Sequence, residues 1–266
     1  MWQNFAEGDL TVNWAGKVLL ITGASSGIGE ALAVEFARRG ASVGLLARRE
    51  EILRSVAGKV AEAGGRALAV AVDVSDAAEV QAATMKVREQ FGQIDVLVAN
   101  AGFGEVTLAR DFQIEVVTKI ISVNLLGAMN SVAAVLPEML ARGSGQIVGI
   151  SSLAAVRGLP GSGAYCASKA ALSIFLESLR VELRASGVHV TTIHPGFIDT
   201  PMTRGRNQRM PHLLTADKAA QLMVRAIEAR RRTYNFPWQL AAWARLGKLL
   251  PDALYDRMLA KALLRQ

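Results

Sequence analysis

Short, continuously apolar runs alternate along this chain with longer segments in which apolar residues recur at helical spacing. The runs are rich in β-branched residues, as V-L-L-I-T after Lys17 and V-T-T-I after His189 show. Parallel strands covered by helices on both faces have this pattern, because neither face of the strand meets water. The predicted strands are Lys17–Thr22, Ser42–Leu46, Arg66–Ala71, Ile94–Ala99, Gly145–Ile150, Val188–Ile193 and Arg232–Phe236.

Amphipathic segments separate these runs, and strands joined by helical crossovers form βαβ units. The sequence therefore predicts an α/β fold with a single Rossmann-type, doubly wound parallel sheet of about seven strands and helices on both faces. We place this domain at residues 1–236 and expect a C-terminal helical extension at residues 237–266. The predicted helices are Ile28–Arg39, Glu51–Ala63, Ala77–Phe91, Phe112–Ala141, Gly163–Ser186 and Ala216–Ala229.

Composition supports a globular domain in a reducing compartment. The chain has 266 residues, of which 51% are hydrophobic and 20% charged, enough for a substantial core. A single cysteine, Cys166, excludes an intramolecular disulfide, and we expect it to serve packing. The charge-free stretch Ile120–Pro137 is interrupted by Asn124 and Gly127, which predicts a buried helix rather than a membrane span. No signal-peptide pattern opens the sequence, so we expect a cytoplasmic protein.

The net charge of +7 is unevenly placed. Residues 204–266 hold thirteen Lys or Arg and four Asp or Glu, whereas the rest of the chain is slightly acidic. A general nucleic-acid binder would spread its basic residues more widely, so no nucleic-acid partner is expected.

A glycine-rich segment, T-G-A-S-S-G-I-G, connects the first predicted strand to the first predicted helix. Glycine lets the backbone turn tightly and approach a pyrophosphate, and the helix start behind it supplies free N–H groups. At this place in a βαβ unit the cluster predicts a dinucleotide site. Its residues are Gly23, Ser25, Ser26, Gly27, Ile28 and Gly29.

The end of the second strand bears on which dinucleotide binds. An acidic residue there would hold a ribose 2′-hydroxyl, but the sequence has Ala47 followed by Arg48. The missing carboxylate and the adjacent cation favour a 2′-phosphate, so we predict NADP(H), with NAD(H) as the less suitable cofactor. The alternative is that Arg48 and Arg49 are solvated charges at a helix start.

Tyr165 and Lys169 lie four residues apart in a predicted helix and therefore share one face. A lysine ammonium beside a phenol favours the phenolate, which suits the phenol to proton transfer. Ser152 is in position to hold a carbonyl or alcohol oxygen. Taken alone, the pair also fits a structural tyrosine and a solvated lysine.

Taken together, these motifs resemble the short-chain dehydrogenase/reductase family over roughly residues 16–236. Four motifs match in addition to the glycine segment and the Ser, Tyr and Lys residues. They are D-V after the third strand, N-A-G after the fourth, S-V-N in the long helix and H-P-G-F-I-D-T after the sixth strand. The resemblance implies further cofactor-binding residues at Asp73, Val74, Asn100, Ala101, Gly102, Pro195, Gly196, Ile198 and Thr200.

The resemblance also implies a reaction and the role of each residue. Ser152 would polarise the substrate oxygen and Tyr165 would transfer its proton. Lys169 would tune the phenol and bind the nicotinamide ribose, and Asn124 would organise a water relay behind it. The expected protein is an NADP(H)-dependent oxidoreductase that acts on a small-molecule carbonyl or secondary alcohol. We expect it to use no metal and to form a homodimer or homotetramer. The alternative is a catalytically idle nucleotide sensor or scaffold on the same fold.

The substrate side and the tail leave two questions open. Leu153–Val156 and Phe197 predict an apolar wall. The loop after the sixth strand carries Arg204, Arg206, Arg209 and His212. These side chains either bind an anionic group of the substrate or are solvated charges on a loop. In the tail, apolar residues recur at roughly helical spacing among basic ones, which predicts packing on the domain or a second subunit, with membrane contact as the alternative. The tail residues concerned are Trp238, Trp243, Arg245, Leu246, Lys248 and Leu250. We expect His189 and His194 to serve packing.

Overall fold

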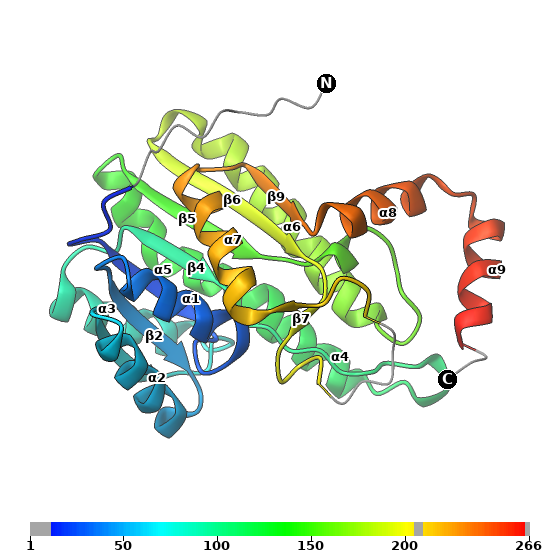
Figure 1. Ribbon diagram of the computed structural model, residues 1–266, viewed down its shortest axis with the longest axis horizontal. Coiled ribbons are helices and arrows are strands. Elements are labelled where there is room, and N and C mark those ends of the chain that lie inside the picture. Colours follow the sequence, from blue (N-terminus) through cyan, green and yellow to red (C-terminus); the bar gives the residue numbers. More distant parts are fainter. Residues whose placement is uncertain (1–11, 205–209, 264–266) are drawn as a thin grey trace.

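The computed structural model describes residues 12–204 and 210–263, and it confirms the predicted doubly wound sheet (Figure 1). Within these residues seven parallel strands form one sheet in the order β3-β2-β1-β4-β5-β6-β9, so the order reverses between β1 and β4. The strands are β1 (Val18–Thr22), β2 (Ser42–Ala47), β3 (Arg66–Ala71), β4 (Val96–Ala99), β5 (Gly145–Ile150), β6 (Val188–Pro195) and β9 (Thr233–Phe236).

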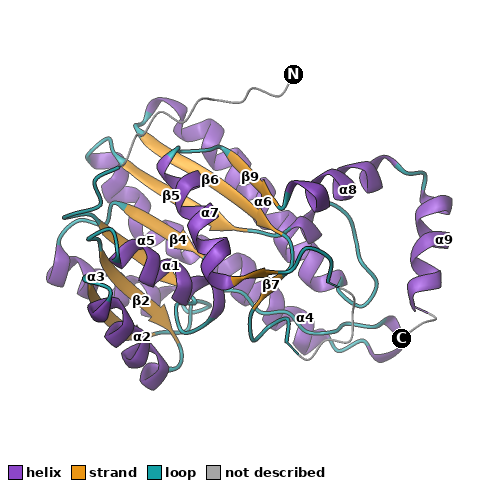
Figure 2. Cartoon of the chain, viewed as in Figure 1, coloured by secondary structure: helices purple, strands orange, loops and turns teal. Residues whose placement is uncertain are grey.

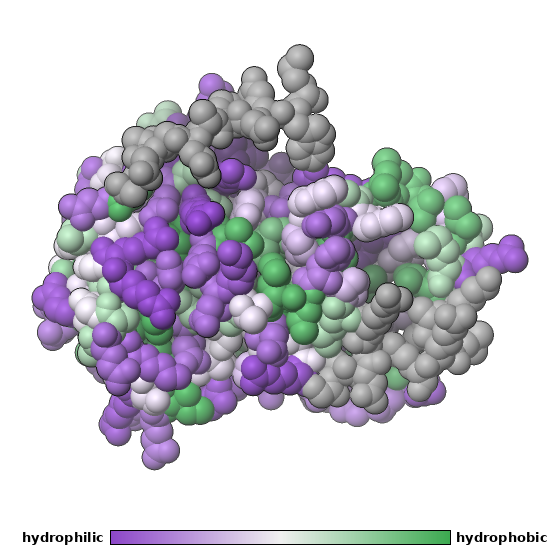
Figure 3. Space-filling view, viewed as in Figure 1, coloured by the Kyte–Doolittle hydropathy of each residue, from purple (hydrophilic) through white to green (hydrophobic). Residues whose placement is uncertain are grey.

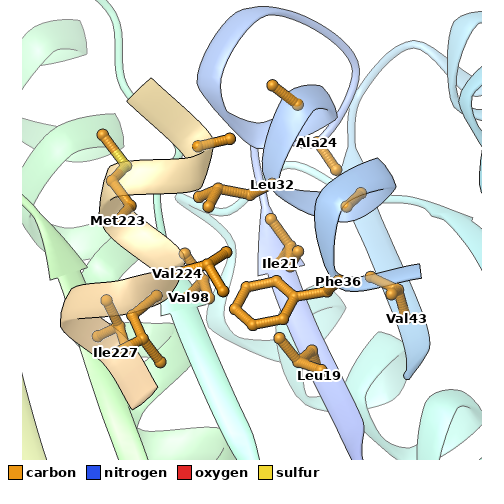
Figure 4. Packing of buried hydrophobic residues seen from close by; sticks show 14 of the residues in the cluster. Leu19, Ile21, Ala24, Leu32, Phe36, Val43, Val98, Met223, Val224 and Ile227 are labelled. Atoms are coloured by element: carbon orange, nitrogen blue, oxygen red, sulfur yellow. The ribbon is translucent and has the colours of Figure 1, made fainter. Parts of the chain in front are cut away.

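Helices cover both faces of the sheet. Since neighbouring residues of a strand point to opposite sides, each central strand contributes to two hydrophobic cores. Leu19 and Ile21 of β1 enter one core, whereas Val18 and Leu20 enter the other. Figure 4 shows Phe36 packing between β1 and α7 in the first core. The first core lies under α1 (Gly27–Ala37), α2 (Glu50–Glu62) and α7 (Ala216–Glu228), and the second under α3 (Ala77–Phe91), α5 (Gly127–Ala141) and α6 (Gly163–Glu182).

The long helix predicted at Phe112–Ala141 begins at Ile114 and contains an irregular turn. It consists of α4 (Ile114–Ile121), a π-helical turn η2 (Ser122–Leu126) and α5. Among the described residues it is the one helix long and apolar enough to cross a membrane. Here it packs against α3, α6 and β4, as a core helix does.

Several short elements were not predicted from the sequence. The 3-10 turns are η1 (Ala109–Asp111), η3 (Leu153–Ala155) and η4 (Leu183–Ala185), of which η4 replaces the last residues of the helix predicted to reach Ser186. A two-residue parallel pair, β7 (Ile198–Asp199) with β8 (Leu214–Thr215), follows β6.

The C-terminal extension is helical and projects from the sheet (Figure 2). It comprises α8 (Trp238–Leu249) and α9 (Asp252–Leu263). Of these two helices, α8 packs against β9 and η3, whereas α9 lies away from the layered domain.

Candidate active site

The glycine segment turns at the carboxyl end of β1, where the strand order reverses. Gly23 and Gly27 have φ of +65° and +59°, a conformation that favours glycine. Gly29 is required for a different reason: a Cβ there would lie 2.4 Å from the carbonyl oxygen of Gly23. Gly23 and Gly27 line the cleft and leave its backbone free of side chains, which is what close approach by a pyrophosphate needs.

Hydrogen bonds join the end of β4 to the end of β1. Buried Thr22 Oγ1 accepts from the backbone N–H groups of Asn100 and Ala101, both at 3.0 Å. In return, Asn100 Nδ2 donates to the carbonyl oxygens of Thr22 (2.9 Å) and Gly23 (3.3 Å). The N-A-G segment therefore holds the shape of the glycine turn.

A cavity of about 380 Å³ lies at this carboxyl end of the sheet. It brings together nearly all of the residues predicted for the site, although they are spread over the chain from the glycine turn to β7. Gly29 and Asn124 are the two predicted residues that do not line it. The predicted residues that line the cavity are Gly23, Ser25, Ser26, Gly27, Ile28, Arg48, Asp73, Val74, Asn100, Ala101, Gly102, Ser152, Tyr165, Lys169, Pro195, Gly196, Ile198 and Thr200.

Two arginines lie where β2 leads into α2. Arg48 and Arg49 are both exposed and both line the cavity. Arg49 donates to Ser25 Oγ at 3.0 Å and to Ser26 Oγ at 3.4 Å, so it reaches the glycine turn. Opposite them, hydrogen bonds from Ser75, and to a lesser extent the nearby charge of Arg48, lower the pKa of Asp73.

Lys169 is the most deeply buried charged group of the site. Its side chain comes from α6, is 3% exposed, and donates from Nζ to the carbonyl oxygen of Ile150 at 2.8 Å. Burial lowers the pKa of Lys169 to about 8. The Nζ atom lies 5.9 Å from the ring centroid of Tyr165, so the predicted pairing of cation and phenol on one helix face is present.

Two consecutive serines follow β5 and have different surroundings. Ser152 lines the cavity, and its Oγ accepts from Ala154 N at 3.1 Å, which caps η3. Ser151 also lines the cavity, but its Oγ donates to the carbonyl oxygen of Lys169 (2.9 Å) and lies 2.8 Å from Ser173 Oγ. The serine assigned by resemblance, Ser152, therefore differs from Ser151 in that its hydroxyl accepts a backbone hydrogen bond, whereas that of Ser151 donates one to Lys169 O.

His194 belongs to the same buried polar network. Its Nε2 lies 3.0 Å from Ser173 Oγ, which in turn donates to the carbonyl oxygen of Lys169. Burial, the main cause, lowers the pKa of His194 to about 4, so the imidazole is neutral at pH 7. A packing role was expected, and this hydrogen bond to the helix that carries Lys169 could not be seen in the sequence.

Asn124 lies in the π-helical turn and is fully buried. Its Oδ1 accepts from Phe103 N at 2.6 Å, and its Nδ2 donates to Phe103 O and to Ser168 Oγ, both at 2.9 Å. The amide thereby connects the loop after β4 to α6. A water relay through this residue stays a prediction.

The loop after β7 does not present Arg204 as a free cation. Arg204 pairs with Asp199, with Nε and Oδ1 2.7 Å apart. His212 is exposed, and Arg206 and Arg209 lie outside the described residues. Leu153–Val156 and Phe197 are half-buried, but none of them lines the cavity, so an apolar wall at these residues stays a prediction.

Some lining residues carried no sequence signal strong enough to single them out. Thr203 is one: its Oγ1 accepts from Thr200 N (3.0 Å) and donates to Ile198 O (2.6 Å), which fixes the segment after β6. Others are Val72, Phe103, Val123, Ile150, Ser151, Pro201 and Met202. Among residues 12–204 and 210–263, no group of three or more His, Cys, Asp or Glu side chains is placed to hold a metal ion.

Known proteins share both this fold and this order of motifs. The family model described as short chain dehydrogenase matches residues 17–211. Because that match covers well over half of the sequence, the chain belongs to the short-chain dehydrogenase/reductase family and is an oxidoreductase of that type.

Individual relatives cover most of the chain. An uncharacterized oxidoreductase of Myxococcus xanthus is 43% identical over 240 residues, covering 90% of this chain and 95% of the relative. The human dehydrogenase/reductase SDR family member 7 is 35% identical, covering 82% and 73%.

Solved structures agree with the fold. A short-chain dehydrogenase/reductase from Burkholderia phymatum in complex with NAD superimposes with a TM-score of 0.82 at 28% identity, covering 89% of this chain and 94% of that one. Levodione reductase superimposes with a TM-score of 0.79, also at 28% identity, covering 86% and 99%.

Proposed function

We propose that this protein is an NADP(H)-dependent oxidoreductase that interconverts a carbonyl and a secondary alcohol, with Tyr165 as general acid and base. The observation that carries the proposal is the buried Lys169 ammonium, held by Ile150 O on the same helix face as Tyr165. A solvated structural lysine would not be 3% exposed. Burial of this charge is costly, and a functional site is where such a cost is retained.

The residues of the cleft fit a nicotinamide dinucleotide. The bare glycine turn suits the pyrophosphate, and Lys169 lies close to the segment after β4, since a Cβ on Gly102 would be 3.4 Å from its Nζ. When bound, the cofactor supplies or accepts the hydride. The rest of the chemistry is acid–base work by this chain.

Each side chain then has a definite task. Ser152 Oγ accepts from Ala154 N with a lone pair, so its own proton is available to the substrate oxygen. With a pKa of about 8, Lys169 is mainly protonated at neutral pH and stabilises the Tyr165 phenolate. In the reducing direction Tyr165 gives its proton to the developing alkoxide, and in the oxidising direction it takes that proton back.

The preference for NADP(H) rests on three neighbouring residues. Ala47 supplies no carboxylate for a ribose 2′-hydroxyl, while Arg48 and Arg49 line the same part of the cavity. A 2′-phosphate would gain charge-assisted hydrogen bonds from such guanidinium groups. We expect NADPH to bind at least about tenfold more tightly than NADH, which corresponds to about 1.4 kcal/mol.

Two measurements test these proposals separately. Tyr165→Phe should abolish turnover of ketones and alcohols while NADPH titration stays near wild type; substantial residual turnover would contradict the role of the phenol. Arg48→Ala should weaken NADPH and leave NADH unchanged, with Arg54→Ala, on the exposed side of α2, as the matched control. Equal affinity of the unmodified protein for the two cofactors would remove the NADP(H) assignment.

A turnover screen also separates the enzyme from an idle sensor. Tight NADPH binding with no oxidation or reduction across a library of ketones and secondary alcohols would favour the sensor. Since Leu153–Val156 directly follow Ser152 and are apolar and half-buried, we place hydrophobic substrates first in that library.

Assembly and location follow as further proposals. Exposed apolar side chains lie on the long helices, with Ile174 67% and Val181 61% exposed on α6. Such positions support pairing of subunits through α5 and α6 into a homodimer or homotetramer. Light scattering after gel filtration would test it, and a monomer would contradict it. We place the protein in the cytoplasm, where its single cysteine stays reduced.

A further inference from the structure

The outer face of α8 exposes large apolar side chains that the domain leaves uncovered. Trp238 is 69% exposed, Trp243 71%, Leu246 56% and Leu249 81%. At 100° per residue these four positions fall within one side of the helix. Figure 3 shows hydrophobic side chains gathered at this end of the molecule. We call this surface the α8 outer face.

The inner face of α8 is already packed on the domain. Ala241 is 6% exposed, and a Cβ on Gly196 would lie 2.9 Å from Leu240 Cδ1 and 3.0 Å from Pro237 Cδ. The helix therefore has an ordinary buried side against the loop after β6. The packing of α8 on the domain therefore does not involve its exposed tryptophan side chains, Trp238 and Trp243.

Arg157 holds the helix pair in place. Its guanidinium donates to the carbonyl oxygens of Gly247 and Leu250, pairs with Asp252 at 2.6 Å, and lies 3.7 Å from the centre of the Tyr255 ring. Tyr255 Oη also donates to Gly158 O at 2.6 Å. The α8 outer face is thus presented by a helix anchored at both ends rather than by a loose tail.

Charge around the outer face indicates its partner. Arg245 and Lys248 are exposed and lie along one border of the apolar residues, and α8 contains no acidic residue. A helix with exposed tryptophan and leucine bordered by cations is suited to the interface of an anionic bilayer. We propose that the α8 outer face docks this protein on an anionic membrane surface.

A second copy of the chain fits this surface less well. Two α8 helices packed face to face would bring two Arg245 and two Lys248 side chains together without an acidic partner on either helix. Like charges at an interface disfavour association, whereas anionic headgroups neutralise them.

Vesicle co-sedimentation of the full chain tests the proposal. Vesicles of phosphatidylcholine alone are compared with vesicles containing equal parts of phosphatidylcholine and phosphatidylglycerol. Since a cationic side chain near an anionic surface strengthens binding about fivefold, Arg245→Gln with Lys248→Gln should weaken binding to the anionic vesicles about 25-fold. Raised salt should weaken wild-type binding in the same direction.

A second pair of changes tests the apolar contribution. Trp243→Ser with Leu246→Ser should weaken binding about tenfold or more, because these side chains would no longer enter the headgroup region. Matched controls are Met85→Ser and Lys86→Gln, an exposed apolar and an exposed basic residue on α3. Both controls should bind vesicles as the wild type does.

The results separate membrane docking from other occupants. No sedimentation of wild type with anionic vesicles overturns the proposal, as does binding that neither pair of changes weakens. Dissociation of an oligomer by Trp243→Ser with Leu246→Ser, without loss of vesicle binding, identifies a subunit contact and also overturns it. NADPH titration of every variant verifies that the domain is folded, and it reads the cofactor site independently of the membrane result.

Discussion

The buried ammonium of Lys169 should make the stability of the cofactor-free protein depend on pH in a predictable way. Burial lowers its pKa from 10.5 to about 8, and Ile150 O accepts from its Nζ. Among the described residues no carboxylate forms an ion pair with it. The unfolded chain keeps this proton up to about pH 10.5, whereas the folded protein releases it above about pH 8. Unfolding therefore takes up a proton in this window, and stability rises with pH.

The size of the effect follows from the two pKa values. At about 1.4 kcal/mol per pH unit, burying the charged form costs about 3 kcal/mol at neutral pH. Between pH 7 and pH 9 about 1 kcal/mol of that cost disappears, because the folded protein loses the proton while the unfolded chain keeps it. Lys169→Met removes the titrating group and with it this part of the pH dependence.

Urea unfolding of the cofactor-free protein at pH 7 and pH 9 provides the measurement. From the lower to the higher pH, the wild type should gain about 1 kcal/mol of unfolding free energy relative to Lys169→Met. Lys218→Met, which removes an exposed lysine from α7, should follow the wild type. Parallel pH dependence of wild type and Lys169→Met would refute the argument, since it would mean that the ammonium is not desolvated.

Three further predictions concern the turn and the network around the site. Gly29→Ala should abolish NADPH binding measured by titration, because its Cβ would lie 2.4 Å from the Gly23 carbonyl oxygen. Thr22→Val removes an acceptor shared by two N–H groups and should lower the unfolding free energy measured in urea by about 2–4 kcal/mol. His194 has a pKa of about 4 in the folded protein and 6.5 ordinarily, so as the pH falls the unfolded chain is protonated at this imidazole before the folded protein is. The unfolding free energy should therefore fall by up to about 3 kcal/mol between pH 6.5 and pH 4. His194→Gln should flatten that loss in urea unfolding at the two pH values, and an unchanged slope would contradict the burial of the imidazole.

The hydrophobic pattern was sufficient to predict the sheet. A strand with both faces covered is apolar at most positions, so the fully buried β1, β2 and β4 are visible as short, mainly apolar runs. Helix ends were less visible, since the helix predicted to end at Ser186 gives way to a 3-10 turn at Leu183. The pair of β7 and β8 could not be predicted because two residues are too few to show a period.

The candidate site was predictable where its chemistry depends on local spacing. Tyr165 and Lys169 share a helix face by their separation alone. Arg49 was missed as a contact because its partners, Ser25 and Ser26, are more than twenty residues away and meet it only through β1 and β2 pairing. The contacts of Asn124 with Phe103 could not be predicted either, because they depend on where a π-helical turn places the amide of Asn124.

One short segment of β5 and its turn accounts for the geometry of the proposed catalytic group. Ile150 O holds the Nζ of Lys169, and the next residue, Ser151, donates to the backbone carbonyl of the same lysine. The residue after that is Ser152, which faces the cavity. Two consecutive residues thus hold both ends of Lys169, and the next residue in the same turn carries the serine that lines the cavity. Groups held in place before the substrate arrives are what electrostatic preorganisation requires, and these two hydrogen bonds partly offset the cost, about 3 kcal/mol, of burying the charge.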